Sequence, residues 1–139
     1  MPVFIEALVI KSTGMWYSLL LPGGEQVQAR LKGKLKLNQS QLSNPIAVGE
    51  KVLVEVENDA ENTYSISQIQ ARKNYIIRKS VHKNNHAHVL AANLDLAVVV
   101  ATMAHPVTSS GFIDRFLVTA EAYDIPACIV FNKIDLLDD

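Results

Sequence analysis

The tetrapeptide Asn132-Lys133-Ile134-Asp135 directly follows an apolar run, Ile129-Val130-Phe131, near the end of this 139-residue chain. The run predicts a buried strand, and Asn-Lys-x-Asp after such a strand is typical of proteins that read guanine. The carboxylate of Asp135 can accept hydrogen bonds from both the ring N–H and the exocyclic amine of guanine. Adenine would leave that carboxylate unpaired, and such a loss can discriminate by roughly 10⁴-fold or more. We expect Asn132 to tie the loop together and the Lys133 stem to lie over the base.

A guanine-reading motif needs a partner that binds the phosphates. The usual partner is Gly-x4-Gly-Lys-Ser/Thr, whose backbone N–H groups surround the phosphates and whose hydroxyl holds Mg²⁺. The chain lacks it, since its Gly-Lys pair, Gly33-Lys34, is followed by Leu35. Either the chain is no GTPase, or the domain is circularly permuted and its phosphate loop lies beyond Asp139. In the second case the chain is a fragment, which by itself should neither hydrolyse GTP nor bind it appreciably.

Charge is distributed unevenly along the chain. Residues 1–86 hold 11 Lys/Arg and 7 Asp/Glu, a balance of +4, whereas residues 87–139 hold 2 and 7, a balance of −5. Such a split suggests different partners for the two halves. The length suits one small domain plus part of another, and one cysteine, Cys128, excludes a disulfide framework. No signal peptide or membrane-spanning run is present, so we expect a cytoplasmic monomer with no membrane partner.

Residues 1–80 predict a small β-barrel. The expected strands are Val3–Lys11, Met15–Leu21, Glu25–Leu31, Lys51–Glu57 and Tyr64–Gln70. In the fourth, Val52, Val54 and Val56 alternate with other residues, as in a half-buried strand. Short strands at this density fit an OB-type barrel, but an SH3-like barrel has the same pattern, and the sequence does not separate the two.

Two basic clusters lie in this part of the chain. The first cluster, in which every second residue is cationic, comprises Arg30, Lys32, Lys34 and Lys36. If extended, its charges project from one side. The second cluster comprises Arg72, Lys73, Arg78, Lys79 and Lys83. Tyr75 lies inside it and Tyr64 just before it, as rings for base stacking. A solvated edge strand guarded by lysines would look similar, but two clusters on a barrel of this type favour RNA contact.

Three histidines, His82, His86 and His88, are candidate metal ligands, because their spacing could place a pair on one helical face. No cysteine or clear carboxylate completes a set of four, so no metal site is predicted in this chain. The neighbouring Asn84-Asn85 and lysines instead predict an exposed linker over residues 81–90.

From Ala91 onward the pattern changes to α/β. Leu94–Ala101 is a nearly continuous apolar run, as in a parallel strand covered on both faces. Ser109 and Ser110 can cap a helix, which Asp124-Ile125-Pro126 ends, and Ala127–Phe131 forms the next strand. One strand–helix–strand unit cannot bury its helix and both faces of its sheet, so this domain looks unfinished.

Several separate blocks of the sequence together resemble the N-terminal part of the ribosome small subunit-dependent GTPase A family (RsgA, also called YjeQ or YloQ). The blocks are 31–35, 48–52, 70–74, 91–95, 112–118 and 131–136. The resemblance covers essentially the whole chain. The family commonly has Gly-Asp where Gly49-Glu50 stands, which is a conservative difference.

This resemblance implies a circularly permuted P-loop GTPase that acts in late maturation of the small ribosomal subunit and is stimulated by it. The implied organisation is a five-stranded OB-type domain at 1–80 that binds rRNA, a linker at 81–90, and the start of the GTPase domain at 91–139. GTP or GDP with Mg²⁺ and a structural Zn²⁺ are implied, with the phosphate loop, switch segments and zinc ligands beyond Asp139. Of the nucleotide-binding residues, Asn132, Lys133 and Asp135 carry over.

Two other readings remain open on the sequence. The chain could be a nucleic-acid-binding barrel with a non-functional vestige of a GTPase. It could also be a structural module whose basic clusters only keep it in solution.

Overall fold

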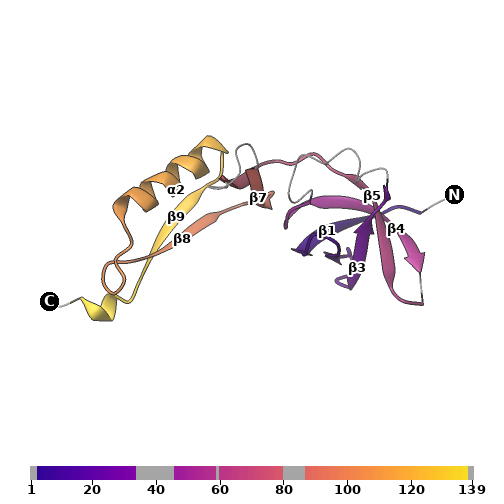
Figure 1. Cartoon of the computed structure of the whole chain (residues 1–139), viewed down its shortest axis with the longest axis horizontal. Helices are drawn as coiled ribbons and strands as arrows, with labels where there is room; N and C mark the ends of the chain where they lie inside the picture. The colour runs from indigo at the N-terminus through magenta and orange to yellow at the C-terminus, as the bar shows by residue number, and fades with distance from the viewer. Residues whose placement is uncertain (1–2, 34–45, 59, 80–86, 138–139) are drawn as a thin grey trace. The chain divides into compact units, whose positions relative to one another are not determined.

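The computed structural model describes residues 3–33, 46–58, 60–79 and 87–137. The chain divides into two compact units, Met1–Asn93 and Leu94–Asp139. Figure 1 shows a barrel in the first unit, and a helix lying along a pair of strands in the second.

The first unit is built on a closed barrel of strand order β1-β2-β3-β5-β4. Its strands are β1 (Ile5–Ser12), β2 (Tyr17–Leu20), β3 (Gln26–Leu31), β4 (Lys51–Asn58) and β5 (Thr63–Ile69). All neighbours are antiparallel except β3 and β5, which pair in parallel. This connectivity is that of the OB fold, so the structure decides between the two barrels that the sequence left open.

Alternation along the strands fills the barrel. On β3 the pattern is strict, with Val27, Ala29 and Leu31 buried and the residues between them exposed. Val52 and Val54 of β4 are buried as predicted, whereas Val56, near the strand's end, is 48% exposed. Strand β2 is shorter than predicted, because a turn over residues 13–16, with Gly14 at φ +87°, precedes it. Side chains of alternate residues thus form one core inside the barrel.

A second, two-stranded sheet continues the first unit. Strands β6 (Tyr75–Lys79) and β7 (Ala87–Ala92) pair antiparallel. The sequence predicted a linker over residues 81–90, and residues 87–90 instead belong to β7. Their alternation was too short and too polar at its start to be recognised as a strand. The β7 end is joined to the barrel, since the N–H of Ala92 donates to the carbonyl of Val48 at 2.9 Å.

The junction between barrel and second sheet is very close at Gly49. Its φ is +90°, and a Cβ built there would lie 2.0 Å from the carbonyl oxygen of Ala92. The side chain of Asn93 donates to the Gly49 carbonyl at 2.8 Å and accepts from the N–H of Lys73 at 2.7 Å. Glycine is therefore required here both by conformation and by space.

The next residue, Glu50, is a fully buried carboxylate at the same junction. One of its oxygens accepts from the N–H of Ala47 at 3.0 Å, and the other accepts from the guanidinium of Arg72. The Arg72 guanidinium also lies 5.5 Å from the centroid of the Tyr75 ring at the start of β6. Since a buried charge must be paired, Arg72 fixes the segment after β5 against the barrel.

The second unit is one strand–helix–strand arrangement, as predicted. Strands β8 (Ala97–Thr102) and β9 (Ala127–Asn132) pair in parallel, joined by α2 (Ser110–Ala122). The predicted cap is confirmed, because the Ser109 hydroxyl accepts from the N–H of Phe112 at 3.3 Å. Alternate residues of β8, including Val99, are buried, and the helix packs against this strand. A short 3₁₀ turn, η1 (Ile134–Leu136), follows β9.

The other face of the β8–β9 pair is uncovered within the described part of the chain. Val98 and Val100 are 46% and 60% exposed, and Val130 of β9, which is in register with Val100, is 45% exposed. The apolar run was predicted from its composition to be covered on both faces, and here it is covered on one. Separately, the described residues include no helix whose length and apolarity would suffice to cross a membrane.

We predict that Gly49→Ala destabilises the first unit more than Gly24→Ala. Both glycines have positive φ, +90° and +85°, but a Cβ at Gly24 would meet nothing within 4 Å. Gly24→Ala should cost about 1 kcal/mol in the free energy of unfolding, from backbone strain alone. Gly49→Ala should cost at least about 2 kcal/mol more, because the Ala92 carbonyl must move. Urea unfolding measures both, and equal costs would mean that the close approach is not enforced.

We also predict that Arg72→Met lowers the free energy of unfolding by about 3 kcal/mol, since it leaves the buried Glu50 carboxylate without its counter-charge. A matched control is Lys51→Met, which removes a 3.9 Å pair with Glu6 in which both side chains are more than half exposed. That control should change stability by less than about 1 kcal/mol. If Arg72→Met is as mild as Lys51→Met, Glu50 does not depend on Arg72.

Candidate functional site

The Asn-Lys-x-Asp motif lies at the carboxyl end of the parallel strands. Asn132 is the last residue of β9 and is in register with Thr102, the last residue of β8. In α/β sheets, ligands bind outside this edge, where loops from neighbouring strands meet. The motif therefore stands where a nucleotide base would be expected.

The backbone turns sharply straight after β9. Lys133 has left-handed dihedral angles, φ 57° and ψ 38°, and precedes η1. The side-chain oxygen of Asn132 accepts from the N–H of Lys133 at 2.9 Å, which holds the turn from inside. Asn132 thus shapes the loop that carries the other two motif residues.

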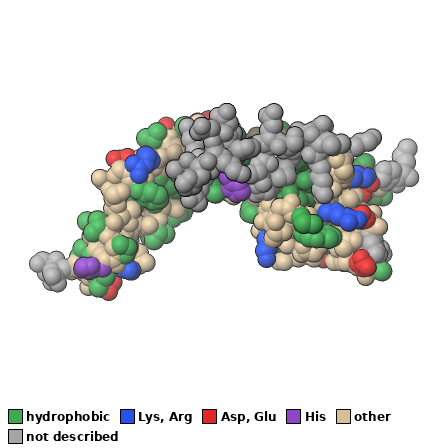
Figure 2. All heavy atoms as spheres, in the orientation of Figure 1, with side chains coloured by type: hydrophobic (Ala, Val, Ile, Leu, Met, Phe, Trp, Pro, Cys, Tyr) green, Lys and Arg blue, Asp and Glu red, His purple; other side chains and the backbone are tan. Residues whose placement is uncertain are grey.

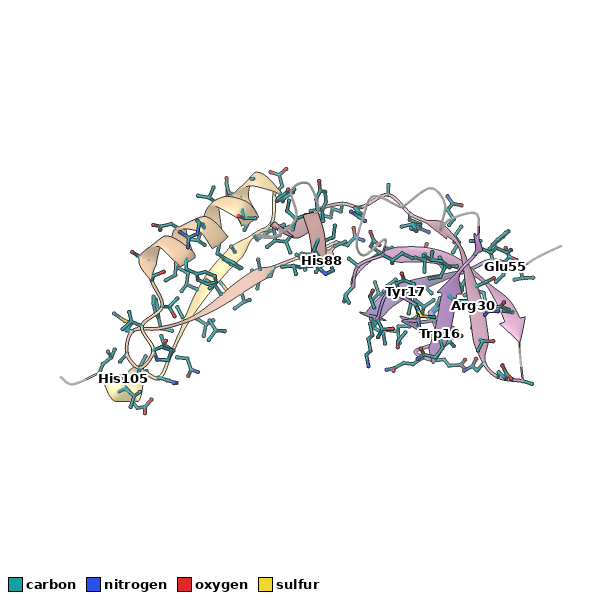
Figure 3. All side chains as sticks on the ribbon, viewed as in Figure 1. Trp16, Tyr17, Arg30, Glu55, His88 and His105 are labelled. Carbon is teal, nitrogen blue, oxygen red and sulfur yellow. The ribbon has the colours of Figure 1, made fainter. Side chains whose placement is uncertain are left out.

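A second loop, residues 103–108, meets the motif. The ammonium group of Lys133 donates to the carbonyl of His105 at 2.9 Å. That loop is closed at its base, where the N–H of Thr108 donates to the carbonyl of Thr102 at 2.8 Å and the Thr108 hydroxyl accepts from the N–H of Thr102 at 3.0 Å. Figure 3 shows His105 at this end of the second unit, beside η1. The Lys133 stem is therefore held in one direction by a braced loop.

Asp135 occupies the middle of η1. It is exposed, as are Asn132 and Lys133. An exposed carboxylate on a short turn, beside a fixed lysine stem, can present its two oxygens to a base that stacks on that stem. The three predicted nucleotide residues thus lie at one edge of the strand pair, because Asn132 ends β9 and Asp135 is three residues beyond it.

In the structure, the described cations of the first basic cluster are paired with glutamates. The guanidinium of Arg30 donates twice to the Glu57 carboxylate, at 2.9 and 2.5 Å. The ammonium group of Lys32 contacts both oxygens of Glu55, at 2.8 and 2.9 Å. The hydrogen bond from Arg30 lowers the pKa of the Glu57 carboxyl and raises that of Arg30. Lys34 and Lys36 lie outside the described residues.

These pairs line a groove of about 570 Å³ on the outside of the barrel. Arg30 is in β3 and Lys32 directly follows that strand, whereas both acids are in β4. Strand β5 lies between β3 and β4, and its Ser65 also lines the groove. On the face drawn in Figure 2, blue basic side chains of the barrel lie beside red and green ones. The groove is polar and locally balanced in charge rather than purely basic.

The second basic cluster is partly structural. Arg72 is bound to buried Glu50, which argues against its use for phosphate contact. Tyr64 is 7% exposed and belongs to the barrel core, so the prediction that its ring is available for stacking is wrong. Its position on β5 in register with Ala29 turns it inward. Lys73 borders the junction, and Arg78 and Lys79 are in β6, while Lys83 lies outside the described residues.

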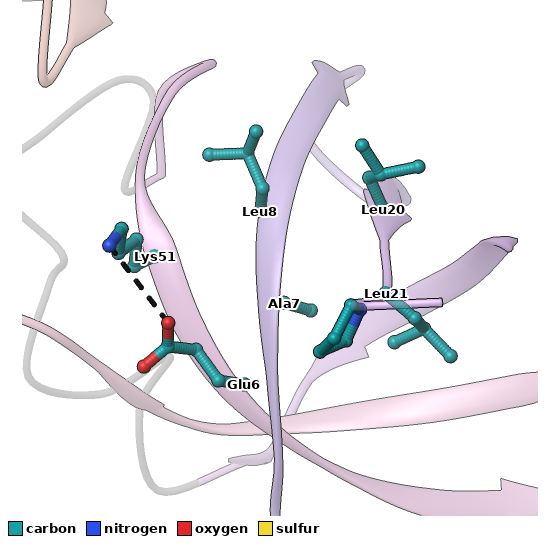
Figure 4. A pocket seen from close by; sticks show the side chains of 7 residues that line it. Glu6, Ala7, Leu8, Leu20, Leu21 and Lys51 are labelled. Atoms are coloured by element: carbon teal, nitrogen blue, oxygen red, sulfur yellow. Dashed lines mark ion pairs between the residues drawn. The ribbon is translucent and has the colours of Figure 1, made fainter. Parts of the chain in front are cut away.

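Of the histidines considered as ligands, His88 is in β7, and His82 and His86 lie outside the described residues. Among the residues that the structure describes, no group of three or more His, Cys, Asp or Glu could hold a metal ion. A smaller hollow of about 330 Å³ lies beside β1 and β2 (Figure 4). It is mainly apolar, with the Glu6–Lys51 pair at its edge, and offers no cluster of reactive groups.

One exposed ring escaped the sequence analysis. Trp16 directly precedes β2, and the guanidinium of Arg30 lies 6.0 Å from its ring centroid. The signal was present, because Trp16 stands at the start of one hairpin strand and Arg30 near the end of the other. Figure 3 shows Trp16 and Arg30 together on the barrel.

Comparison with known proteins agrees with these observations. The RsgA GTPase family profile matches residues 69–139. The small ribosomal subunit biogenesis GTPase RsgA of Azobacteroides pseudotrichonymphae is 47% identical over 97% of this chain and 43% of that protein. Its counterpart from Bacteroides fragilis strain YCH46 is 45% identical, with the same shares covered. The chain thus spans less than half the length of these relatives.

Solved structures show the same architecture. YjeQ from Thermotoga maritima superposes with a TM-score of 0.71 at 28% identity, over 99% of this chain and 44% of that one. YloQ, described as a circularly permuted GTPase, gives 0.69 at 28% identity, over 99% and 43%. The predicted fold class, an OB-type barrel followed by the first strand–helix–strand of a permuted GTPase domain, is confirmed. The chain belongs to the RsgA GTPase family.

Proposed function

We propose that this chain is the N-terminal part of a cytoplasmic GTPase that assists maturation of the small ribosomal subunit. The observation that carries the proposal is the position of Asn132, Lys133 and Asp135 at the carboxyl edge of a parallel strand pair, in a chain of this family. The relatives are named small ribosomal subunit biogenesis GTPases, and this supports the assignment to that process.

Asp135 would read guanine by accepting from its ring N–H and its amine. The Lys133 stem, held by the His105 carbonyl, would cover one face of the base, and Asn132 would keep the turn between them closed. These residues fit the base of GTP or GDP. No residue described here is assigned to the phosphates, to Mg²⁺ or to a structural Zn²⁺, and we place those ligands in the remainder of the parent protein.

The uncovered face of the β8–β9 pair supports this division. The face that carries Val98, Val100 and Val130 exposes apolar side chains next to one another, and such faces of a parallel sheet are normally covered by other elements. A full GTPase sheet would add strands and helices there. We therefore assign GTP hydrolysis to the complete protein and expect the 139-residue chain alone to lack it, because phosphoryl transfer requires the phosphates and metal to be held in place.

The barrel would make the contact with the ribosomal subunit, through rRNA. Candidate contacts are Arg30, Lys32, Lys34 and Lys36 of the first basic cluster and Lys73, Arg78 and Lys79 of the second. Because Arg30 and Lys32 are paired with acids, RNA phosphates would have to compete with Glu57 and Glu55 for them. A nucleic-acid-binding module without GTPase activity remains the alternative, and base preference separates the two.

We predict that Asp135→Asn, made in the complete protein, shifts preference from guanosine to xanthosine nucleotides. The new amide would present a donor to guanine's own donors, whereas xanthine carries a carbonyl where guanine has the amine. Loss of one hydrogen bond to a charged group costs roughly 1.5–3 kcal/mol, so GTP affinity should fall about 10- to 100-fold while XTP affinity rises. Competition binding with GTP and XTP measures the ratio.

Asp114→Asn is the matched control, since Asp114 is an exposed carboxylate on α2 and is not part of the motif. It should leave the ratio unchanged. An Asp135→Asn protein that prefers GTP as strongly as the unmodified protein would remove Asp135 from base recognition and favour the alternative.

A further inference from the structure

We propose that Trp16 and Arg30 form a stacking platform on the barrel for an unpaired nucleotide of single-stranded RNA. The inference rests on the proposed function, in which the barrel contacts rRNA, and it names the chemistry of that contact. It differs from a purely electrostatic interface, because the base ring rather than the phosphate would supply most of the affinity.

The backbone under Trp16 is fixed before any ligand arrives. The carbonyl of Trp16 accepts from the N–H of Thr13 at 3.1 Å and from the Thr13 hydroxyl at 2.9 Å. Gly14, at φ +87°, makes the turn between them possible. The Trp16 ring is therefore attached to a closed four-residue turn and not to an open loop, so less ordering remains to be done on binding.

Arg30 is held in place just as firmly. Strands β2 and β3 pair with Tyr17 opposite Ala29, which sets Arg30 across from Trp16. Two hydrogen bonds to Glu57 fix the guanidinium while it lies 6.0 Å from the centre of the Trp16 ring. A guanidinium has further N–H donors beyond these two, and they can reach a phosphate oxygen.

Both groups remain accessible. Trp16 is 39% exposed, and the side chain of Arg30 is 55% exposed. Arg30 lines the groove on the outside of β3, β5 and β4, and Trp16 lies next to Arg30 at the start of β2. In OB folds, this strand face and the adjoining loops bind oligonucleotides.

The charges of the groove favour a base over phosphates as the main contact. Lys32 is paired with Glu55 as Arg30 is with Glu57, so these pairs add no net positive charge. A phosphate gains little from cations that already have partners, whereas a base that stacks on Trp16 breaks no ion pair. The bases of an RNA duplex are stacked on one another, so only a single strand or loop can offer one to the ring.

The chain has one tryptophan, so its fluorescence reports on this site directly. The test is a titration of the 139-residue chain with an unlabelled single-stranded RNA of about ten mixed nucleotides, and with the same strand in a duplex. The single strand should quench the Trp16 emission to saturation, and the duplex should not. In parallel, anisotropy of the same RNA carrying a dye measures binding without relying on Trp16.

Trp16→Ala should weaken binding by about 5- to 150-fold, the equivalent of roughly 1–3 kcal/mol for one stacked base. Trp16→Phe should retain much of the affinity, because it keeps an aromatic face. Phe112→Ala, which removes a ring that is 48% exposed on α2 in the other unit, should leave affinity unchanged. Circular dichroism melting checks that each variant is folded. If Trp16→Ala does not fold, the quenching of Trp16 in the unmodified chain and the affinity of Trp16→Phe still test the site.

The outcomes separate this inference from the function beneath it. RNA that binds by anisotropy without quenching Trp16, or that binds Trp16→Ala as tightly as the unmodified chain, overturns the stacking platform and leaves RNA contact by the barrel standing. If neither fluorescence quenching nor anisotropy detects RNA binding, both the stacking platform and RNA contact by the barrel are overturned. Equal quenching by the duplex would also reject the platform, since a duplex offers no unpaired base.

Discussion

The first unit depends on a buried carboxylate at the place where its two sheets meet. Glu50 is fully buried, and it is compensated by the N–H of Ala47 and the guanidinium of Arg72. A buried charge without a partner would cost several kcal/mol, so the segment that carries Arg72 has little freedom to leave the barrel. Gly49 beside it allows the backbone of Ala92 to approach where no other residue would fit. Together these contacts attach β6 and β7 to the barrel.

Pairing with glutamates also reduces the positive charge that the basic residues of the first unit present. In sequence they form two cationic clusters, yet Arg30, Lys32 and Arg72 each bind a glutamate. Exposed pairs of this kind contribute little to stability, so their effect on recognition matters more. They make a surface that attracts polyanions less than its lysine and arginine content suggests. Specific contacts, such as a ring that stacks on a base, then gain in relative weight.

Sequence patterns predicted most of the architecture, for reasons visible in particular residues. The five barrel strands lie close to the ranges that their sequence predicts, with strict alternation on β3, and Ser109 caps α2 as its position indicated. The motif at 132–135 lies where its preceding strand required. What sequence could not supply were relations between distant residues. Nothing near Arg72 reveals that Glu50 lies beneath it, and Tyr64 looks available until the register of β5 turns it into the core. Trp16 and Arg30 become neighbours through the exact register of β2 with β3, which the sequence does not specify.

We propose that the barrel and the second unit have separate tasks, so the barrel should recognise the small ribosomal subunit even where GTP cannot be bound. The direct measurement is sedimentation of the 139-residue chain with purified small ribosomal subunits in the absence of nucleotide, with large subunits as the comparison. The account predicts that the chain travels with the small subunit and not with the large one. A chain that stays in solution with both, while the complete protein binds the small subunit, would contradict it.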